Sequence, residues 1–167
     1  SDGSGIATNY TLTNGTLTMT IVPRSTTVSG TKTYDGTTNV SSSNLTSFSN
    51  LAGSDTLSLS GTGTISSADV GTGKTVNTSG LTIDNSSGVG TNYTLSSATV
   101  NVTERVIGLS GVRAFDGTNN ASSADLSMSN LVSGENLTLS GSGTLPNATV
   151  EMNKAITLGS LSISDGS

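Results

Sequence analysis

Apolar and polar residues alternate over short stretches along most of the chain. Leucine fills every second position within Thr56–Ser60, and Ala98, Val100 and Val102 alternate with Thr99 and Asn101. A period of two points one row of side chains inward and the next outward, which predicts half-buried β-strands. On the same ground we expect strands near residues 11–13, 16–22, 26–33, 74–78, 80–83 and 93–95, and near 136–140, 154–158 and 160–163.

Turn residues separate these stretches. Asn14-Gly15, Asp35-Gly36, Gly71-Thr72-Gly73 and Asp116-Gly117 have the composition of tight turns between antiparallel strands. Short strands joined by glycine-rich turns predict an all-β chain of tandem immunoglobulin-like β-sandwich units, and a β-grasp-like fold is the alternative.

The composition fits thin sandwiches. The 167 residues include 60 Ser or Thr, 21 Gly and 2 Pro, with 31% apolar and 3% aromatic residues, so each core has little material. The connectors near residues 20–25 and 103–107 lack the looseness of a Gly/Ser coil, so two such units in series should form an elongated particle. The net charge of −5 comes from scattered single charges, which argues against a nucleic-acid partner. No apolar run approaches the roughly 20 residues of a membrane span.

Cysteine and histidine are both absent. Their absence excludes disulfides, zinc sites of the Cys/His type, cysteine nucleophiles and the Ser-His-Asp triad. The acidic residues stand singly, without the supporting motifs of a carboxylate pair or a calcium loop. We therefore expect no catalytic residues, no metal site and no cofactor.

The chain repeats itself with a period of about eighty residues. Thr33–Thr37 returns as Ala114–Thr118, a shift of 81, and Leu57–Thr64 returns as Leu137–Thr144, a shift of 80. Thr8–Leu12 returns as 91–95 at a shift of 83. A period of this length indicates separate beads rather than the rungs of a solenoid.

Two frames divide the chain into such beads. In the first, residues 1–24 are the closing strands of a preceding repeat, 25–105 form one complete repeat, and 106–167 form a second repeat that is incomplete at its C-terminal side. That second bead would expose core residues unless strands from another chain complete it head to tail; these residues are Leu137, Leu139, Ile156 and Leu161. In the alternative frame the beads are 5–86 and 88–167, and each folds alone.

Four elements, in this order, carry a resemblance to a known family: Thr31–Thr37, Ala68–Val76, Ser79–Thr82 and Asn92–Leu95. They resemble the YDG repeats that occur in tandem in filamentous-haemagglutinin-like and high-molecular-weight bacterial adhesins, many of them exported by two-partner secretion. The resemblance implies a secreted or cell-surface segment of a stalk or fibre, acting in adhesion or in a biofilm matrix. It implies no enzyme activity. The second copy departs by having Phe115 for tyrosine and Glu151-Met152-Asn153 for Gly-Thr-Gly.

The repeat anchors include four aromatic rings and two turns. Tyr34 and Phe115 share one slot, and Tyr10 and Tyr93 share another. We expect these rings to be buried, because a thin core needs their area. Asp35 and Asp116 precede Gly36 and Gly117 and are expected to cap the backbone of their turns.

Two further kinds of residue are candidate sites. Lys74 and Lys154 recur between the copies, and we expect each to pair with a carboxylate such as Asp35 or Asp116. An amide cross-link from these lysines to Asn39 or Asn120 is a second interpretation, which we do not favour. Phe48 has no aromatic counterpart in the second copy, so it is the candidate contact if the chain binds glycans or another cell surface. The expected partners are otherwise neighbouring repeats, including head-to-tail self-assembly.

Overall fold

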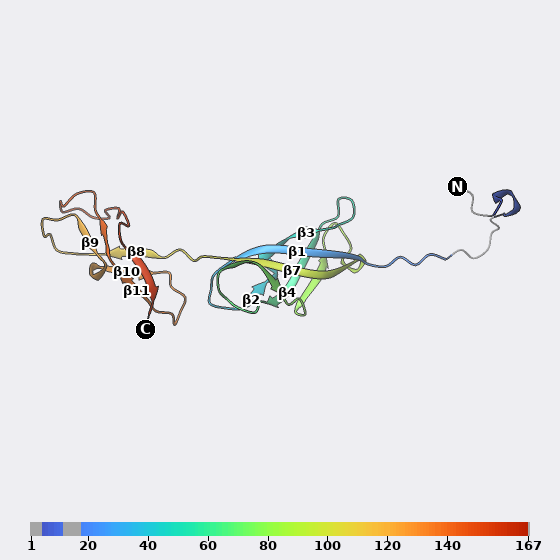
Figure 1. The fold of residues 1–167 in the computed structure, drawn as a ribbon, viewed down its shortest axis with the longest axis horizontal. Coiled ribbons are helices and arrows are strands. Elements are labelled where there is room, and N and C mark those ends of the chain that lie inside the picture. The colour runs from blue at the N-terminus through green and yellow to red at the C-terminus, as the bar shows by residue number, and fades with distance from the viewer. Residues whose placement is uncertain (1–4, 12–17, 167) are drawn as a thin grey trace.

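The computed structural model describes residues 5–11 and 18–166, so the expected Asn14-Gly15 turn and parts of the strands expected near 11–13 and 16–22 lie outside the described residues. Two β units follow one another in an elongated molecule (Figure 1). Residues 5–11 and 18–23 extend from the first unit on the side away from the second (Figure 1). Among the described residues, no helix is long and apolar enough to cross a membrane.

The described elements are thirteen strands and four short 3-10 helices, so the all-β prediction is confirmed. They are η1 (Ala7–Asn9), β1 (Arg24–Thr33), β2 (Asn39–Ser41), η2 (Ser42–Asn44), β3 (Leu45–Ser49), β4 (Leu57–Thr64), β5 (Gly71–Val76), β6 (Leu81–Asn85), η3 (Gly90–Asn92), β7 (Tyr93–Thr103), β8 (Gly108–Gly111), β9 (Asn120–Ser122), η4 (Ser123–Asp125), β10 (Leu126–Ser129), β11 (Leu137–Ser140), β12 (Ser142–Thr144) and β13 (Ser162–Asp165).

The first unit, from β1 to β7, is a sandwich of two sheets. One sheet has the order β3-β1-β7-β5 and the other the order β2-β4-β6. The neighbours β1 and β7 run parallel, with Val28 opposite Ala98, Gly30 opposite Val100 and Lys32 opposite Val102. On its other side β7 pairs antiparallel with β5. Strand β7 therefore lies inside its sheet, with a neighbour on each edge.

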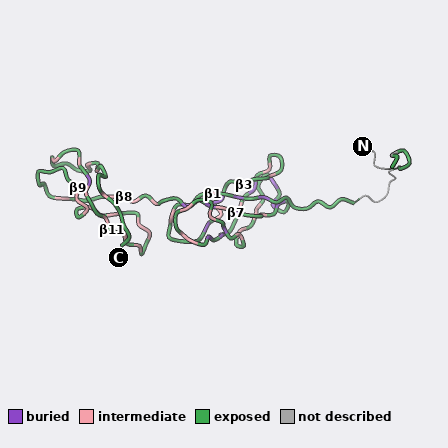
Figure 2. The backbone as a smooth tube through the Cα atoms, viewed as in Figure 1, coloured by how far each residue is buried: buried purple, intermediate pink, exposed green. Residues whose placement is uncertain are grey.

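The core of the first unit lies between these sheets. Its buried cluster consists of Val28, Val40, Leu45, Ile65, Val76, Ala98, Val100 and Val102. Three of these eight residues belong to β7, and each is at most 2% exposed. Figure 2 accordingly shows the buried positions concentrated in the first unit. Because burying one such side chain contributes about 1.5 to 3 kcal/mol, β7 supplies a large share of the stabilisation.

The second unit reproduces most of this arrangement without a counterpart of β7. Its described pairs are β8 with β10, β9 with β12 and β11 with β13. Strand β8 has 4 residues where β1 has 10, and residues 151–156, which correspond to β5, form no strand. Ala121 and Gly143 are its buried residues, while Leu137, Leu139, Ile156 and Leu161 are half-buried. The core of the second unit is therefore open.

The alternative frame of 5–86 and 88–167 is wrong for this structure. It would place β7 in the second unit, but β7 pairs with β1 from Arg24 to Thr33. Tyr10, which that frame places inside a folded bead, is 76% exposed. The long parallel pairing with β1 fixes β7 in the first unit, because that pairing buries three core residues.

Candidate functional site: the joint and the open groove

The two Asp-Gly turns have the same local geometry. The Asp35 carboxylate accepts hydrogen bonds from the backbone N–H of Thr37 at 2.9 Å and from its hydroxyl at 3.0 Å, and Asp116 does the same with Thr118 at 2.8 and 2.9 Å. The glycine after each aspartate has a positive φ, 74° at Gly36 and 79° at Gly117. The expected capping by both aspartates is therefore present, and the glycines allow the left-handed turn.

A cation stands beside each of these turns, buried at Lys32 and half-buried at Arg113. The Lys32 side chain is 4% exposed, and its ammonium lies 2.8 Å from the Asp35 carboxylate. It also donates to the carbonyl oxygens of Thr37, at 2.8 Å, and Asn39, at 2.5 Å. Burial pushes the pKa of Asp35 upward, but the hydrogen bonds from Lys32 and Thr37 outweigh it and leave the pKa below its usual value.

Arg113 takes the place of Lys32 in the second unit. It pairs with Asp116, and its hydrogen bond lowers the pKa of that carboxyl to about 2. The sequence carries a signal for both pairs, because each cation precedes its Asp-Gly by three residues. Lys32 and Arg113 are the residues that the sequence reasoning missed.

The expected pairing of Lys74 and Lys154 with these aspartates is therefore wrong. Lys74 donates to the backbone oxygen of Ser67 at 3.1 Å. Lys154 donates to Asn147 Oδ1 at 2.5 Å and to the Thr149 carbonyl, and it lies 3.9 Å from Glu151. Each lysine holds the loop that precedes it, because a nearer cation already occupies the aspartate.

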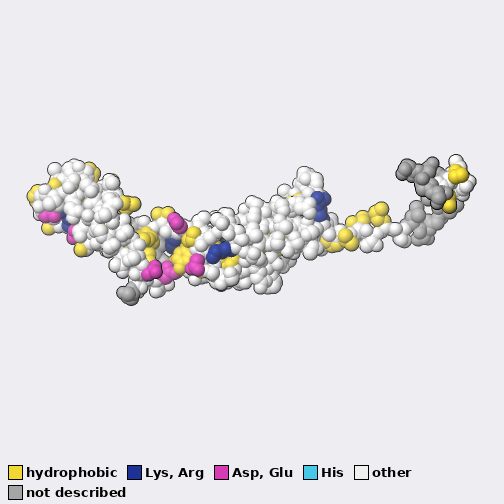
Figure 3. Space-filling model, viewed as in Figure 1, with side chains coloured by type: hydrophobic (Ala, Val, Ile, Leu, Met, Phe, Trp, Pro, Cys, Tyr) yellow, Lys and Arg dark blue, Asp and Glu magenta, His cyan; other side chains and the backbone are white. Residues whose placement is uncertain are grey.

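Tyr34 connects the two units. Its hydroxyl donates to Glu135, and a Cβ at Gly36, two residues further on, would come within 2.9 Å of Val132. The hydrogen bond to Glu135 raises the pKa of the Tyr34 phenol. Beside this contact, Arg105 donates to the Asn130 backbone oxygen at 2.6 Å and to its side-chain oxygen at 2.7 Å. These residues form a joint, where Figure 3 shows charged side chains of both signs gathered between the units.

The other anchor rings differ in their burial. Tyr93 is 7% exposed, and its hydroxyl donates to Asp55 at 2.5 Å while accepting from the Ala52 N–H at 3.0 Å. The bond to Asp55 raises the pKa of Tyr93. Tyr10 and Phe115 are 76% and 67% exposed, so the expected burial is wrong for both.

Phe48 lies on β3 opposite Val28 and packs, half-buried, against the core of the first unit. The surroundings of Phe48 therefore give its ring a packing role.

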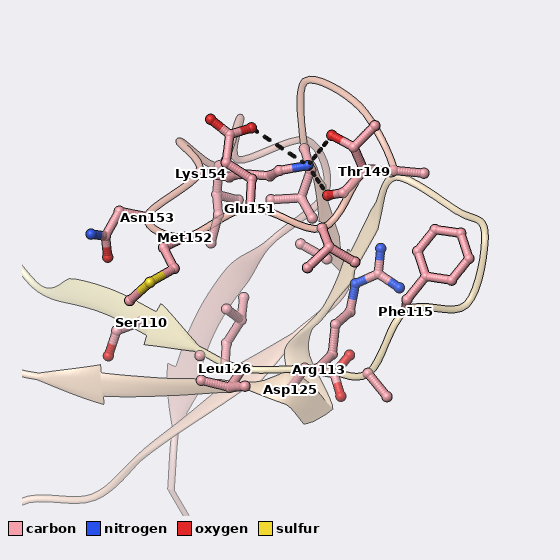
Figure 4. Close-up of a pocket in the computed structure, with 18 of the residues that line it drawn as sticks. Ser110, Arg113, Phe115, Asp125, Leu126, Thr149, Glu151, Met152, Asn153 and Lys154 are labelled. Carbon is pink, nitrogen blue, oxygen red and sulfur yellow. Dashed lines mark hydrogen bonds and ion pairs between the residues drawn. The ribbon is translucent and has the colours of Figure 1, made fainter.

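A groove of about 570 Å³ opens into the second unit. One wall is residues 109–115, which include most of β8, and the facing wall is residues 147–154 together with Ile156. Figure 4 shows Arg113 and Leu126 beneath this space, with Met152 and the Lys154 loop across from them. We call this space the open groove. Within the described ranges, no three Asp or Glu side chains gather closely enough to hold a metal ion.

The two β units follow one another, and a single joint connects them. Each unit has its own copy of the Asp-Gly turn and of the cation–aspartate pair. This arrangement defines an all-β tandem-repeat protein. The family model of the YDG domain matches residues 13–100 and again residues 103–167. The chain belongs to the YDG domain family and contains two adjacent copies of the domain. No curated protein and no solved structure matches it.

Proposed function

We propose that this chain is a non-catalytic structural segment of a bacterial cell-surface or secreted adhesin, where it acts as part of a stalk or fibre in adhesion or a biofilm matrix. The observation that carries the proposal is the joint between the units. Strand β7 continues through residues 104–107 into β8, so the backbone passes from one unit to the next over four residues. A segment whose two units are joined by so short a connection holds its two ends at a fixed distance from each other.

The chemistry of the joint supports a fixed spacing. The connection is Glu104-Arg105-Val106-Ile107, which lacks the Gly and Ser of a flexible coil. Arg105 is held by Asn130, and the Asn130 amide in turn donates to the Val106 carbonyl at 2.7 Å. These hydrogen bonds are exposed, so each contributes less than the roughly 1.5 to 3 kcal/mol typical of hydrogen bonds to charged groups, but bending at the joint breaks all of them together.

Distances between spin labels test the fixed joint. The chain has no native cysteine, so Ser58→Cys with Thr138→Cys places one label on an exposed strand position of each unit. We expect a narrow distance distribution, comparable to that of a control pair within the first unit, Ser58→Cys with Thr31→Cys. Arg105→Ala should broaden the first distribution and leave the control unchanged. A broad distribution in the otherwise unaltered chain would overturn the spacer proposal.

The proposed location is tested on intact bacteria that produce the parent protein. Antibodies raised against residues 24–103 should label the cells or their culture medium without permeabilisation. Labelling that requires permeabilised cells would contradict a surface or secreted role.

A binding role is the competing outcome. A glycan array on which the chain bound one sugar class, and lost that binding in a folded Phe48→Ala variant, would replace the spacer proposal by a carbohydrate-binding one. The packing of Phe48 against the core makes a folding control necessary for that variant.

A further inference from the structure

The Tyr-Asp-Gly turn, residues 34–36, is fixed to the point where the chain leaves the first unit. The backbone N–H of Tyr34 donates to the Thr103 carbonyl at 2.8 Å, and the Tyr34 carbonyl accepts from Arg105 at 3.5 Å. Thr103 is the last residue of β7, and Arg105 belongs to the connection between the units. The backbone of the turn therefore lies beside the start of that connection.

Two positions of the turn face the second unit. The Tyr34 hydroxyl donates to the Glu135 carboxylate. A Cβ at Gly36 would lie 2.9 Å from Val132 Cγ1, which is too short for a real Cβ contact, and Val132 is branched at Cβ and cannot turn its methyl groups away freely. The loop comes so close because residue 36 has no side chain. We call residues 132–135 the receiving loop; the Glu135 N–H donates to the Val132 carbonyl at 3.1 Å and closes it.

The residues that flank Tyr34 form the ion pair beneath the turn. The Lys32 ammonium lies 2.8 Å from the Asp35 carboxylate and donates to the Thr37 carbonyl at 2.8 Å. The same carboxylate accepts from the N–H and the hydroxyl of Thr37. A turn held in this way presents its side chain in one direction, because the conformations that it would otherwise sample break these bonds. The ion pair therefore restricts where the Tyr34 ring points.

The connection alone leaves the direction of the second unit open. A single stretch of backbone, residues 104–107, joins the units (Figure 1). Each of its residues has two soft backbone torsions, so a short connection limits the distance between the units more than their relative direction. Arg105 and Asn130 support the connection at one point, and a unit supported at one point can swing about it. The contacts of the turn with the receiving loop add a second point of support.

We propose that the Tyr-Asp-Gly turn is a docking surface that sets the angle between neighbouring repeats, with the receiving loop of the following repeat as its partner and with Lys32 and Asp35 as positioning residues. The recognition chemistry is a hydroxyl donor and the space above a glycine, matched by a carboxylate acceptor and a branched apolar side chain. The inference rests on the proposed function and deepens it, because the connection limits the distance and the turn adds the direction.

A pair of glycine variants separates docking from backbone strain. Gly36 and Gly117 have φ values of 74° and 79°, so an alanine at either position carries the same strain. A Cβ at Gly36 meets Val132, whereas a Cβ at Gly117 meets nothing within 4 Å. With spin labels at Ser58→Cys and Thr138→Cys, Gly36→Ala should lose the narrow distance peak of the unaltered chain, and Gly117→Ala should keep it. Adding Val132→Ala to Gly36→Ala makes room for the new methyl group and should restore the peak.

The same labels test the positioning residues. Lys32→Met and Asp35→Asn each break the ion pair while leaving the receiving loop intact, and both should lose the narrow peak. The label pair within the first unit should keep its distribution in both variants, which shows that this unit remains folded. Lys32→Arg keeps the charge and should keep the peak. Asp116→Asn makes the same change in the second turn and should also keep it.

The two proposals fail differently in these measurements. A broad distribution in the unaltered chain would overturn the spacer proposal and this inference with it. A narrow peak that persists in Gly36→Ala and in Asp35→Asn would overturn only the inference and leave the spacer standing. Equal loss of the peak in Gly36→Ala and Gly117→Ala, or a double variant with Val132→Ala that stays broad, would attribute the effect to strain and refute docking by the turn.

Discussion

The buried ammonium of Lys32 offers a direct test of what stabilises the first unit. Lys32→Met keeps most of the aliphatic stem and removes the charge that contacts the Asp35 carboxylate and the carbonyl oxygens of Thr37 and Asn39. Removing one member of a buried ion pair typically costs about 3 to 5 kcal/mol. Asp35 is 47% exposed, so water can hydrate its carboxylate after the change. We therefore expect the lower end, a loss of about 3 kcal/mol in the free energy of unfolding.

Two substitutions serve as matched controls for Lys32→Met. Lys32→Arg should cost about 1 kcal/mol, because Arg113 fills the same slot in the second unit. Lys74→Met removes a lysine that makes one hydrogen bond, to Ser67, and should also cost about 1 kcal/mol.

The assay must report on the first unit alone, because two units need not unfold together. Amide hydrogen exchange at Val100 and Val102, both buried in β7, measures that unit's opening free energy. A loss below about 0.5 kcal/mol for Lys32→Met, or an equal loss for Lys74→Met, would refute the assignment of the buried cation as a main stabilising contact.

Four other predictions follow from described contacts. In urea unfolding of the first unit, Tyr34→Phe should cost less than about 1 kcal/mol, because the hydroxyl only contributes to the joint, and Tyr34→Ala about 3 kcal/mol, because the ring packs on the core. Equal losses would show that the hydroxyl matters as much as the ring. Asp116 has a folded pKa of about 2, below the unfolded value near 3.9, so its stabilisation is present above pH ~4 and is lost as the pH falls through 2. Asp116→Asn should remove that acid dependence from thermal unfolding of the second unit. An unchanged pH profile would rule out Asp116 as its source. A Cβ on Gly30 would lie 1.7 Å from a backbone oxygen, so Gly30→Ala should lower the free energy of unfolding by about 4 kcal/mol in denaturant titrations. Gly73 has a φ of 61° and open space around it, so Gly73→Ala should cost only about 1 kcal/mol. Similar costs for the two variants would show that the sheet adapts around residue 30. Mass spectrometry should give the intact mass without loss of ammonia or water, and such a loss would reveal a lysine–asparagine cross-link.

Several strands were predictable, because alternation depends only on the chain itself, but the strand expected near residues 154–158 is wrong, and β2 and β3 were not expected. The expected strands at residues 26–33 and 98–102 lie within β1 and β7. Their parallel pairing was not predictable from alternation, because alternation shows which face of a strand is buried but not which strand lies beside it.

The candidate site was only partly predictable for a related reason. The capping by Asp35 depends on residues beside it, and it is present. Lys74 was expected to be the cation that pairs with Asp35, but the cation is Lys32. Lys32 follows Val28 and Gly30 on the inward-facing positions of β1. The burial of Phe115 was expected from its match to Tyr34, but burial depends on a neighbouring unit, which a local motif does not encode.

The parallel pairing of β1 with β7 has a consequence for a stalk under tension. The chain enters the first unit at Arg24, at the start of β1, and leaves it at Thr103, at the end of β7. A pulling force applied between neighbouring units therefore drags these two strands past each other along their length. Ten residue pairs, from Arg24 with Tyr93 to Thr33 with Thr103, carry the load together instead of opening one after another. Such shear resists extension far better than peeling, a property that the proposed role as a fibre segment would use.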